Sequence, residues 1–308
     1  MNRSASDTHE PPADYALLDI GELALEGGGT IPSCQLAVAT WGTPNEARDN
    51  TVLLPTWFGG THKRWSGHIG PDHALDPRRY FIVAINQLGN GLSTSPHTTD
   101  DERIALSRFP ALTIGDDVTA GERVLREHFG IEEFFAVVGG SMGARLVYEW
   151  AVRFPDRVHR AAPIAGTAQD TARTRVWVPA GLTRNWWQWQ GPAYAMQAHV
   201  MASMFGVQFD MDRIAMGTLH DKWQAGDVTR HANGDLRATL GRIRAKTFVL
   251  AVNNDTLFPV SDCRAEQQLI RDSELRVIDD PAGHFALFGL NPGYLQQVDH
   301  HLSELFAA

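Results

Sequence analysis

The chain has few cysteines and no Cys/His pairs with the spacing of a metal site. Cys34 and Cys263 are the only two cysteines among 308 residues. Two cysteines cannot form a disulfide framework for a chain of this length, and the sequence holds no C-x-x-C motif. We therefore expect both to be small, buried, apolar side chains. No metal or organic cofactor is implied.

Long apolar runs and basic runs are also missing. No 18-residue apolar stretch is present, which argues against a membrane span. The polar residues 1–15 lack an apolar core of signal-peptide length. Lysine and arginine total 27 against 36 for aspartate and glutamate, a formal net charge of −9, and this balance disfavours a nucleic-acid binder. We expect a cytoplasmic protein whose partner is a small molecule.

Short apolar runs alternate with helical patterns along the chain. This alternation predicts an α/β fold whose parallel sheet carries helices on both faces. A capping pair, Thr113 and Asp116, and a terminal Gly130 mark one of the helices. Residues 17–40 predict a β-hairpin around a triple glycine. The apolar runs, expected to be buried strands, are 51–54, 80–85, 134–138, 161–165, 246–252 and 275–278.

The strand pattern stops between residues 166 and 244. We expect a helical lid there, with 1–165 and 245–308 forming the core and 1–14 a loose tail. The stretch holds five of the nine tryptophans, three of them clustered at 186–189, and five of the seven methionines. Lid packing is the simpler role for these side chains, and an aromatic wall of a cleft is the alternative. A homodimer through the lid would also cover apolar surface. The residues are Trp186, Trp187 and Trp189; Met196, Met201, Met204, Met211 and Met216; and three arginines expected to be solvated, Arg173, Arg175 and Arg184.

The segment 139–143 reads Gly-Gly-Ser-Met-Gly and fits G-x-S-x-G. An apolar strand ends just before it, and a helical pattern that stops at Pro155 begins just after Ser141. This context predicts a nucleophile elbow, a sharp turn that lifts the serine hydroxyl above the strand ends. The alternative is a glycine-rich turn with an incidental serine.

A serine hydroxyl is a poor nucleophile at neutral pH and needs a base. In this arrangement an acid and then a histidine follow the serine along the chain, each after a late strand. His284 follows the last predicted strand, and Asp255 lies on the first loop after the preceding one. An acid there would hold the imidazole in its useful tautomer. Three rival acids are Asp262, Asp279 and Asp280.

Catalysis by such a serine also needs two backbone N–H groups directed at the developing oxyanion. Met142, the residue after the nucleophile, should supply one. The glycine-rich loop 55–60, after the first buried strand, should supply the other. We expect the N–H of Phe58 to be this donor, with Trp57 as second choice; an ordinary turn is the alternative reading of the glycines.

Several segments together resemble the homoserine O-acetyltransferase family of α/β-hydrolases. They are residues 139–143, 149–157, 41–50, 70–80 and 255–259. The resemblance covers most of the chain outside 166–244. It implies an α/β-hydrolase fold with a helical lid and the triad Ser141, Asp255 and His284, and it places the first oxyanion donor near Phe58.

The departures from this family concern the acceptor. In the acetyltransferases an aspartate follows the catalytic histidine and binds the amino group of homoserine, whereas here the residue is Phe285. The oxyanion loop 56–60 and the loop 86–96 also differ. Relatives that keep the triad and lose the homoserine contacts are acetyl esterases.

We therefore expect a serine carboxylesterase that hydrolyses short-chain (acetyl) esters through an acyl-serine intermediate. Trp57 and Phe285 are the expected substrate contacts. The alternative is an O-acetyltransferase that moves an acyl group from acyl-CoA to homoserine or to a less polar alcohol. A third hypothesis is a ligand-binding protein that kept the fold without catalysis.

Overall fold

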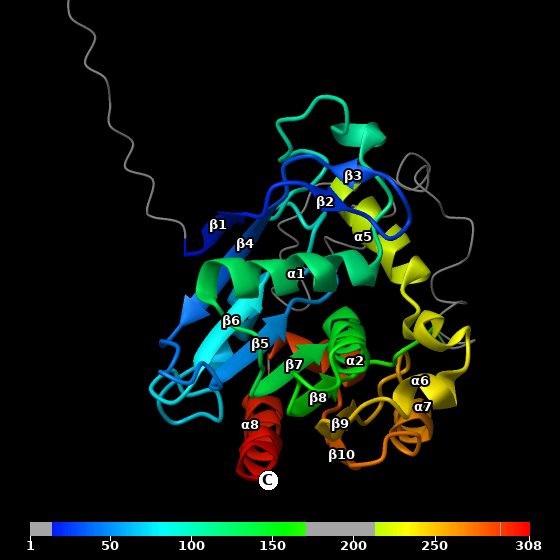
Figure 1. Cartoon of the computed structure of the whole chain (residues 1–308). Helices are drawn as coiled ribbons and strands as arrows, with labels where there is room; N and C mark the ends of the chain where they lie inside the picture. Colours follow the sequence, from blue (N-terminus) through cyan, green and yellow to red (C-terminus); the bar gives the residue numbers. More distant parts are fainter. Residues whose placement is uncertain (1–13, 171–212, 290) are drawn as a thin grey trace, which may run out of the picture.

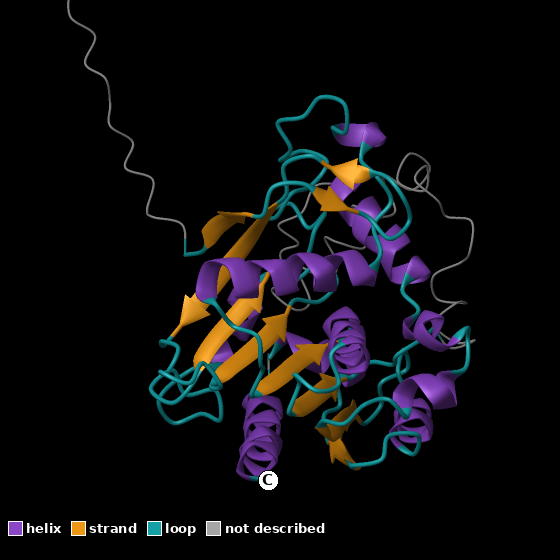
Figure 2. Cartoon of the chain, viewed as in Figure 1, coloured by secondary structure: helices purple, strands orange, loops and turns teal. Residues whose placement is uncertain are grey.

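The structure is a computed structural model that describes residues 14–170, 213–289 and 291–308. Eight strands form one twisted sheet, with helices on both sides (Figures 1 and 2). The sheet strands are β1 (Ala16–Asp19), β4 (Gln35–Trp41), β5 (Thr51–Pro55), β6 (Phe81–Ile85), β7 (Ala136–Gly140), β8 (Arg160–Ile164), β9 (Lys246–Val252) and β10 (Ser273–Ile278). The helices are α1 (Ile114–Phe129), α2 (Met142–Arg153), α5 (Arg213–Ala225), α6 (Leu236–Leu240), α7 (Val260–Gln267) and α8 (Pro292–Ala307). Short 3₁₀ turns are η1 (His62–His68), η2 (Leu106–Arg108), η3 (Val228–Ala232) and η4 (Gly283–Phe288).

The strand order is β1-β4-β6-β5-β7-β8-β9-β10. From β6 to β10 every neighbouring pair is parallel, whereas β4 is antiparallel to both β6 and β1. The carboxyl ends of the parallel strands therefore meet at one edge, where ligands bind in open α/β sheets. This arrangement confirms the predicted fold class.

Two apolar clusters separate the sheet from its helices. Successive residues of one strand point to opposite faces, so Leu53 joins the cluster under α1, α2 and α7, while Val52 and Leu54 join the cluster under α8. In the view of Figure 1, α1 and α2 lie in front of the sheet. Both faces of the central strands are buried, which explains their continuous apolar runs.

The helix predicted after Thr113 is confirmed with both of its caps. Thr113 and Asp116 form a reciprocal capping box, and Gly130 ends α1 with a left-handed φ of 63°. Neither cysteine forms a disulfide: both are buried, and burial raises the pKa of each thiol to about 12. The expectation of two inert, buried side chains is therefore confirmed.

Two sequence predictions need correction. The hairpin predicted at 17–40 is two nested antiparallel pairs: β1 pairs with β4, and β2 (Leu23–Ala24) pairs with β3 (Thr30–Ile31) between them. The strand predicted at 134–138 is β7, which begins two residues later and continues through Gly140. It continues because Gly139 and Gly140 pair with β8, whereas Phe134 makes only an isolated bridge to Val158.

The middle of the predicted lid, with its tryptophan cluster and its three arginines, lies outside the described residues. The described end of the segment consists of α5, η3 and α6, in agreement with the helical prediction. Within the described residues, no helix is long and apolar enough to cross a bilayer.

A buried ion pair joins α5 to α1. Lys222 Nζ on α5 lies 2.6 Å from Asp117 Oδ2 on α1 and donates to the carbonyl of Leu88 at 2.8 Å. Burial raises the pKa of Asp117 and lowers that of Lys222, because desolvation disfavours both charged forms. The attraction between the two groups opposes both shifts. The pair therefore stabilises the fold only while both members are present.

We predict that Lys222→Met lowers the free energy of unfolding by about 3–5 kcal/mol, because it leaves the Asp117 carboxylate buried without a charged partner, with only the Leu88 N–H donating to it. Urea denaturation followed by circular dichroism measures this loss. The double variant Asp117→Asn with Lys222→Met should recover part of it, since the amide carries no charge.

The matched control is the exposed pair between Arg244 and Asp156, whose side chains are each 71% exposed. Arg244→Met should cost less than about 1 kcal/mol. Equal losses for Lys222→Met and Arg244→Met would contradict the structural role assigned to the buried pair.

Candidate active site

Ser141 occupies a strained turn between β7 and α2. Its φ of 53° and ψ of −120° lie in a region that side chains rarely adopt, at a cost of about 1–3 kcal/mol. The turn is held by its neighbours: Ser141 N–H donates to the carbonyl of Ile164 on β8 at 2.9 Å. This strand, sharp turn and helix have the geometry of a nucleophile elbow.

The glycines around Ser141 are required by close backbone packing. A Cβ on Gly139, in β7, would lie 2.5 Å from the carbonyl oxygen of Gly143, in the first turn of α2. A Cβ on Gly143 would lie 2.9 Å from the carbonyl oxygen of Pro55, at the end of β5. The elbow therefore rests directly on the loop that follows β5.

His284 lies against both Ser141 and Asp255. Its Nε2 is 3.0 Å from Ser141 Oγ, and its Nδ1 is 2.8 Å from Asp255 Oδ2. The other carboxylate oxygen of Asp255 accepts hydrogen bonds from the backbone N–H groups of Leu257 and Phe258, both at 2.8 Å. The carboxylate is thus fixed on both sides. These three side chains can activate a serine nucleophile.

Backbone contact also brings the acid and the histidine together. Gly283, just before His284, has a φ of 56°, and a Cβ there would lie 2.5 Å from the carbonyl oxygen of Asn254. Asn254 precedes Asp255. The loops after β9 and β10 therefore meet at a point that only glycine can occupy, and each loop presents one side chain toward Ser141.

The three rival acids have other partners. Asp262 lies within α7 and accepts from Ser261, and Asp279 accepts from Asn253. Asp280 accepts from Ala282 N–H and from Asn291, which fixes the loop before His284. The structure thus places Asp255, rather than any of these, against His284.

The backbone N–H groups of Met142 and Phe58 are the two oxyanion donors expected from the sequence. Met142 begins α2, so its N–H has no acceptor within the helix. Among the described residues, neither Met142 N–H nor Phe58 N–H donates to a carbonyl or a side-chain oxygen. Both are therefore suited to the oxyanion role expected from the sequence.

Gln87, which the sequence analysis did not single out, holds the Phe58 loop. Its side-chain amide donates to the carbonyl of Thr56 at 2.6 Å, and its backbone N–H donates to Thr56 Oγ1 at 3.4 Å. Gln87 is 2% exposed and lies two residues after the end of β6. The sequence could have indicated this role, because Gln87 is a polar residue near the end of the strand that neighbours β5 in the sheet.

The two expected substrate contacts differ in their surroundings. Trp57 is 5% exposed and packs edge-on against Trp65, with ring centroids 5.5 Å apart. Phe285 is half-buried on η4 and stacks on Phe288 with an angle of 14° between the rings. Their contact with substrate stays a prediction.

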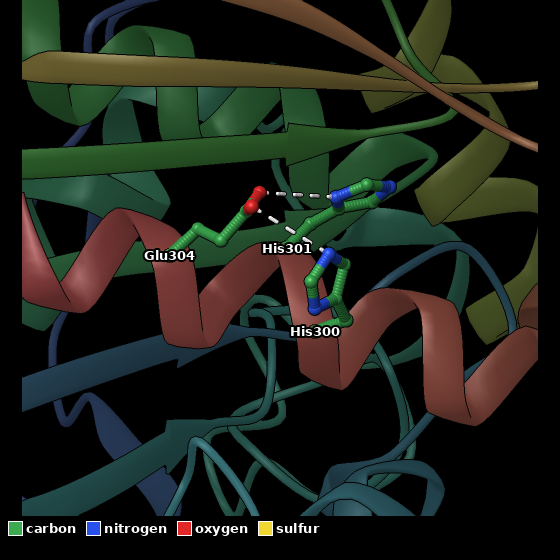
Figure 3. Close-up of side chains that lie close together, drawn as sticks. All are labelled: His300, His301 and Glu304. Carbon is green, nitrogen blue, oxygen red and sulfur yellow. Dashed lines mark ion pairs between the residues drawn. The ribbon is translucent and has the colours of Figure 1, made fainter.

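Among the described residues, one group of side chains has ligand atoms close enough to hold a metal ion. His300, His301 and Glu304 lie together on α8 (Figure 3). Glu304 is 3.5 Å from His300 Nε2 and 3.7 Å from His301 Nδ1. However, Arg276 Nη1 on β10 lies 3.1 Å from the same carboxylate, and its positive charge opposes a cation. We interpret the group as an ion-pair network between α8 and β10.

The family model of the alpha/beta hydrolase fold matches residues 50–289. The chain belongs to this family. Within it, the chain is 46% identical to a probable esterase of Corynebacterium glutamicum, with 97% of each chain covered. It is 40% identical to an ethyl acetate hydrolase of Pseudomonas veronii, with 98% of each covered.

More distant relatives include the acetyltransferases. A homoserine O-acetyltransferase of Thermobifida fusca is 34% identical, over 89% of this chain and 90% of that protein. Among solved structures, an acetylester hydrolase from C. glutamicum has a TM-score of 0.88 and 46% identity, with 96% of each chain covered. These findings confirm the resemblance and group the chain with the esterase-type members.

We predict that Gln87→Leu slows the reaction of the protein with a fluorophosphonate by about tenfold or more. The loss should stay below the roughly 10²–10³-fold cost of removing an oxyanion donor outright, because Phe58 N–H is displaced and not deleted. Single-turnover labelling rates measure the effect. The exposed Gln268→Leu is the control, and equal rates for both variants would argue against a positioning role for Gln87.

Proposed function

We propose that the protein is a serine carboxylesterase that hydrolyses acetyl and other short-chain esters through an acyl-Ser141 intermediate. The observation that carries the proposal is the continuous Ser141–His284–Asp255 hydrogen-bond path at the carboxyl edge of the sheet. The esterase and acetylester hydrolase names of the most similar relatives support the same activity.

The geometry suits each step of acyl transfer. His284 Nε2 accepts the proton of Ser141 Oγ as the oxygen attacks the ester carbonyl, and then returns it to the leaving alcohol. Asp255 holds the Nδ1–H tautomer and stabilises the imidazolium. The N–H groups of Met142 and Phe58 donate to the oxyanion. Water, activated by the same histidine, then releases the acid and restores the serine.

Phe285 favours water over homoserine as the acceptor. Its aromatic ring cannot pair with an ammonium group, and a buried unpaired charge costs several kcal/mol. In this proposal residues 166–244 form a lid over the site, while 1–165 and 245–308 form the hydrolase core. A homodimer through the lid and a cytoplasmic location stay predictions from the sequence.

We predict that the purified protein hydrolyses p-nitrophenyl acetate and that Ser141→Ala lowers kcat by at least about 10³-fold. Release of p-nitrophenolate measures the rate. Ser303→Ala, at an exposed position on α8, is the matched control and should keep the wild-type rate.

A second assay separates hydrolysis from transfer. With acetyl-CoA and homoserine present, we expect ester hydrolysis to continue with little O-acetylhomoserine formed. Fast acetyl transfer to homoserine with negligible hydrolysis would overturn the proposal in favour of the O-acetyltransferase alternative. If a fluorophosphonate failed to label Ser141, the non-catalytic ligand binder would be the better description.

A further inference from the structure

The described part of the predicted lid contributes one aromatic side chain to the neighbourhood of the site. Trp223, on α5, has its ring centroid 5.7 Å from that of Phe58, in the oxyanion loop. The centroid of the Trp223 ring is also 6.5 Å from that of Phe258. The Phe258 centroid is 5.4 Å from that of the His284 ring. These rings form a continuous aromatic wall, Phe58–Trp223–Phe258, that ends at the histidine.

The backbone of Trp223 is fixed relative to the nucleophile. Arg145 lies on α2, four residues after Ser141, and is 1% exposed. Its Nη1 donates to the carbonyl of Trp223 at 2.9 Å and to that of Gly226 at 2.8 Å. The preceding residue, Lys222, is held by its buried ion pair with Asp117. The backbone at Trp223 is therefore held by α1 and by α2, the helix that begins directly after Ser141.

The indole ring of Trp223 is oriented by packing against the described residues around it. Trp223 Nε1 is buried and has no hydrogen-bond partner among the described residues. Its role at this position therefore depends on the size and shape of the ring. A rigid apolar ring beside a reacting centre limits the size of the group that fits there.

The contacts of Trp223 indicate which part of an ester it borders. The leaving alcohol must lie at His284 Nε2, because that atom gives it a proton. Trp223 contacts the oxyanion loop through Phe58 and reaches His284 only through Phe258. A ring packed on the oxyanion loop, and separated from the histidine by Phe258, is better placed to border the acyl side of a bound ester than its leaving group.

We propose that Trp223 is a specificity-determining residue that restricts the acyl group to a few carbons. The proposal rests on the esterase activity proposed above and adds the substrate class: esters with short acyl chains and variable alcohols. Removing the indole opens space for further methylenes, each worth about 10-fold or more in kcat/KM in an apolar pocket.

The test measures kcat/KM for p-nitrophenyl acetate, butyrate, hexanoate and octanoate with the wild type, Trp223→Ala and Trp223→Phe. The hexanoate-to-acetate ratio should rise at least about tenfold in Trp223→Ala, with Trp223→Phe in between. A second series, ethyl, butyl and hexyl acetate, varies only the alcohol and should keep its wild-type order. Ratios within one preparation cancel the fraction of folded enzyme, and Trp223→Phe keeps the test valid if the alanine variant is unstable.

Trp41→Ala is the matched control, because Trp41 is a half-buried tryptophan on β4 that packs against the apolar cluster under α8. It should leave the acyl ratio unchanged. An unchanged ratio in Trp223→Ala, or a shift in the alcohol series in place of the acyl series, would overturn the proposal. A wild type that hydrolyses no ester would instead overturn the esterase function.

Discussion

The close backbone contact between the elbow and the β5 loop determines the rest of the site. Gly143 lies so near the carbonyl groups of Pro55 and Thr56 that a Cβ would be 2.9 and 3.1 Å from their oxygens. Gln87 binds the Thr56 carbonyl from another side. The strained serine and the proposed second oxyanion donor are thus parts of one packed unit, so that neither can move without the other.

The same principle brings the acid to the histidine. Gly283 meets the carbonyl of Asn254 at a distance that excludes any side chain. Parallel strands β9 and β10 end side by side, and this contact closes the gap between their loops. One glycine contact therefore joins the elbow to the β5 loop, and the other joins the loops of the acid and the histidine.

Local patterns were enough to predict the sheet strands, the α1 caps and the elbow, because each depends on residues close together in the chain, whereas the order of the triad followed from the order of the strands in this fold. Asp117 and Lys222 are 105 residues apart, and nothing in their local sequence marks them as partners. Trp223 was overlooked for the same reason: its contacts with Phe58 and Phe258 come from tertiary packing. The early end predicted for β7 reflects the low strand propensity of Gly139 and Gly140, which pairing with β8 overrides.

The fate of an acyl-serine depends on which acceptor the site can hold. An amino-acid acceptor needs a carboxylate for its ammonium group. Asp255 cannot serve, because one of its oxygens accepts two backbone N–H groups and the other faces His284. Phe285, which follows the histidine, is half-buried and apolar, and the buried Phe258 ring lies 5.4 Å from the imidazole. An apolar side chain next to the histidine gives an ammonium group no compensation for its lost hydration, which favours water as the acceptor.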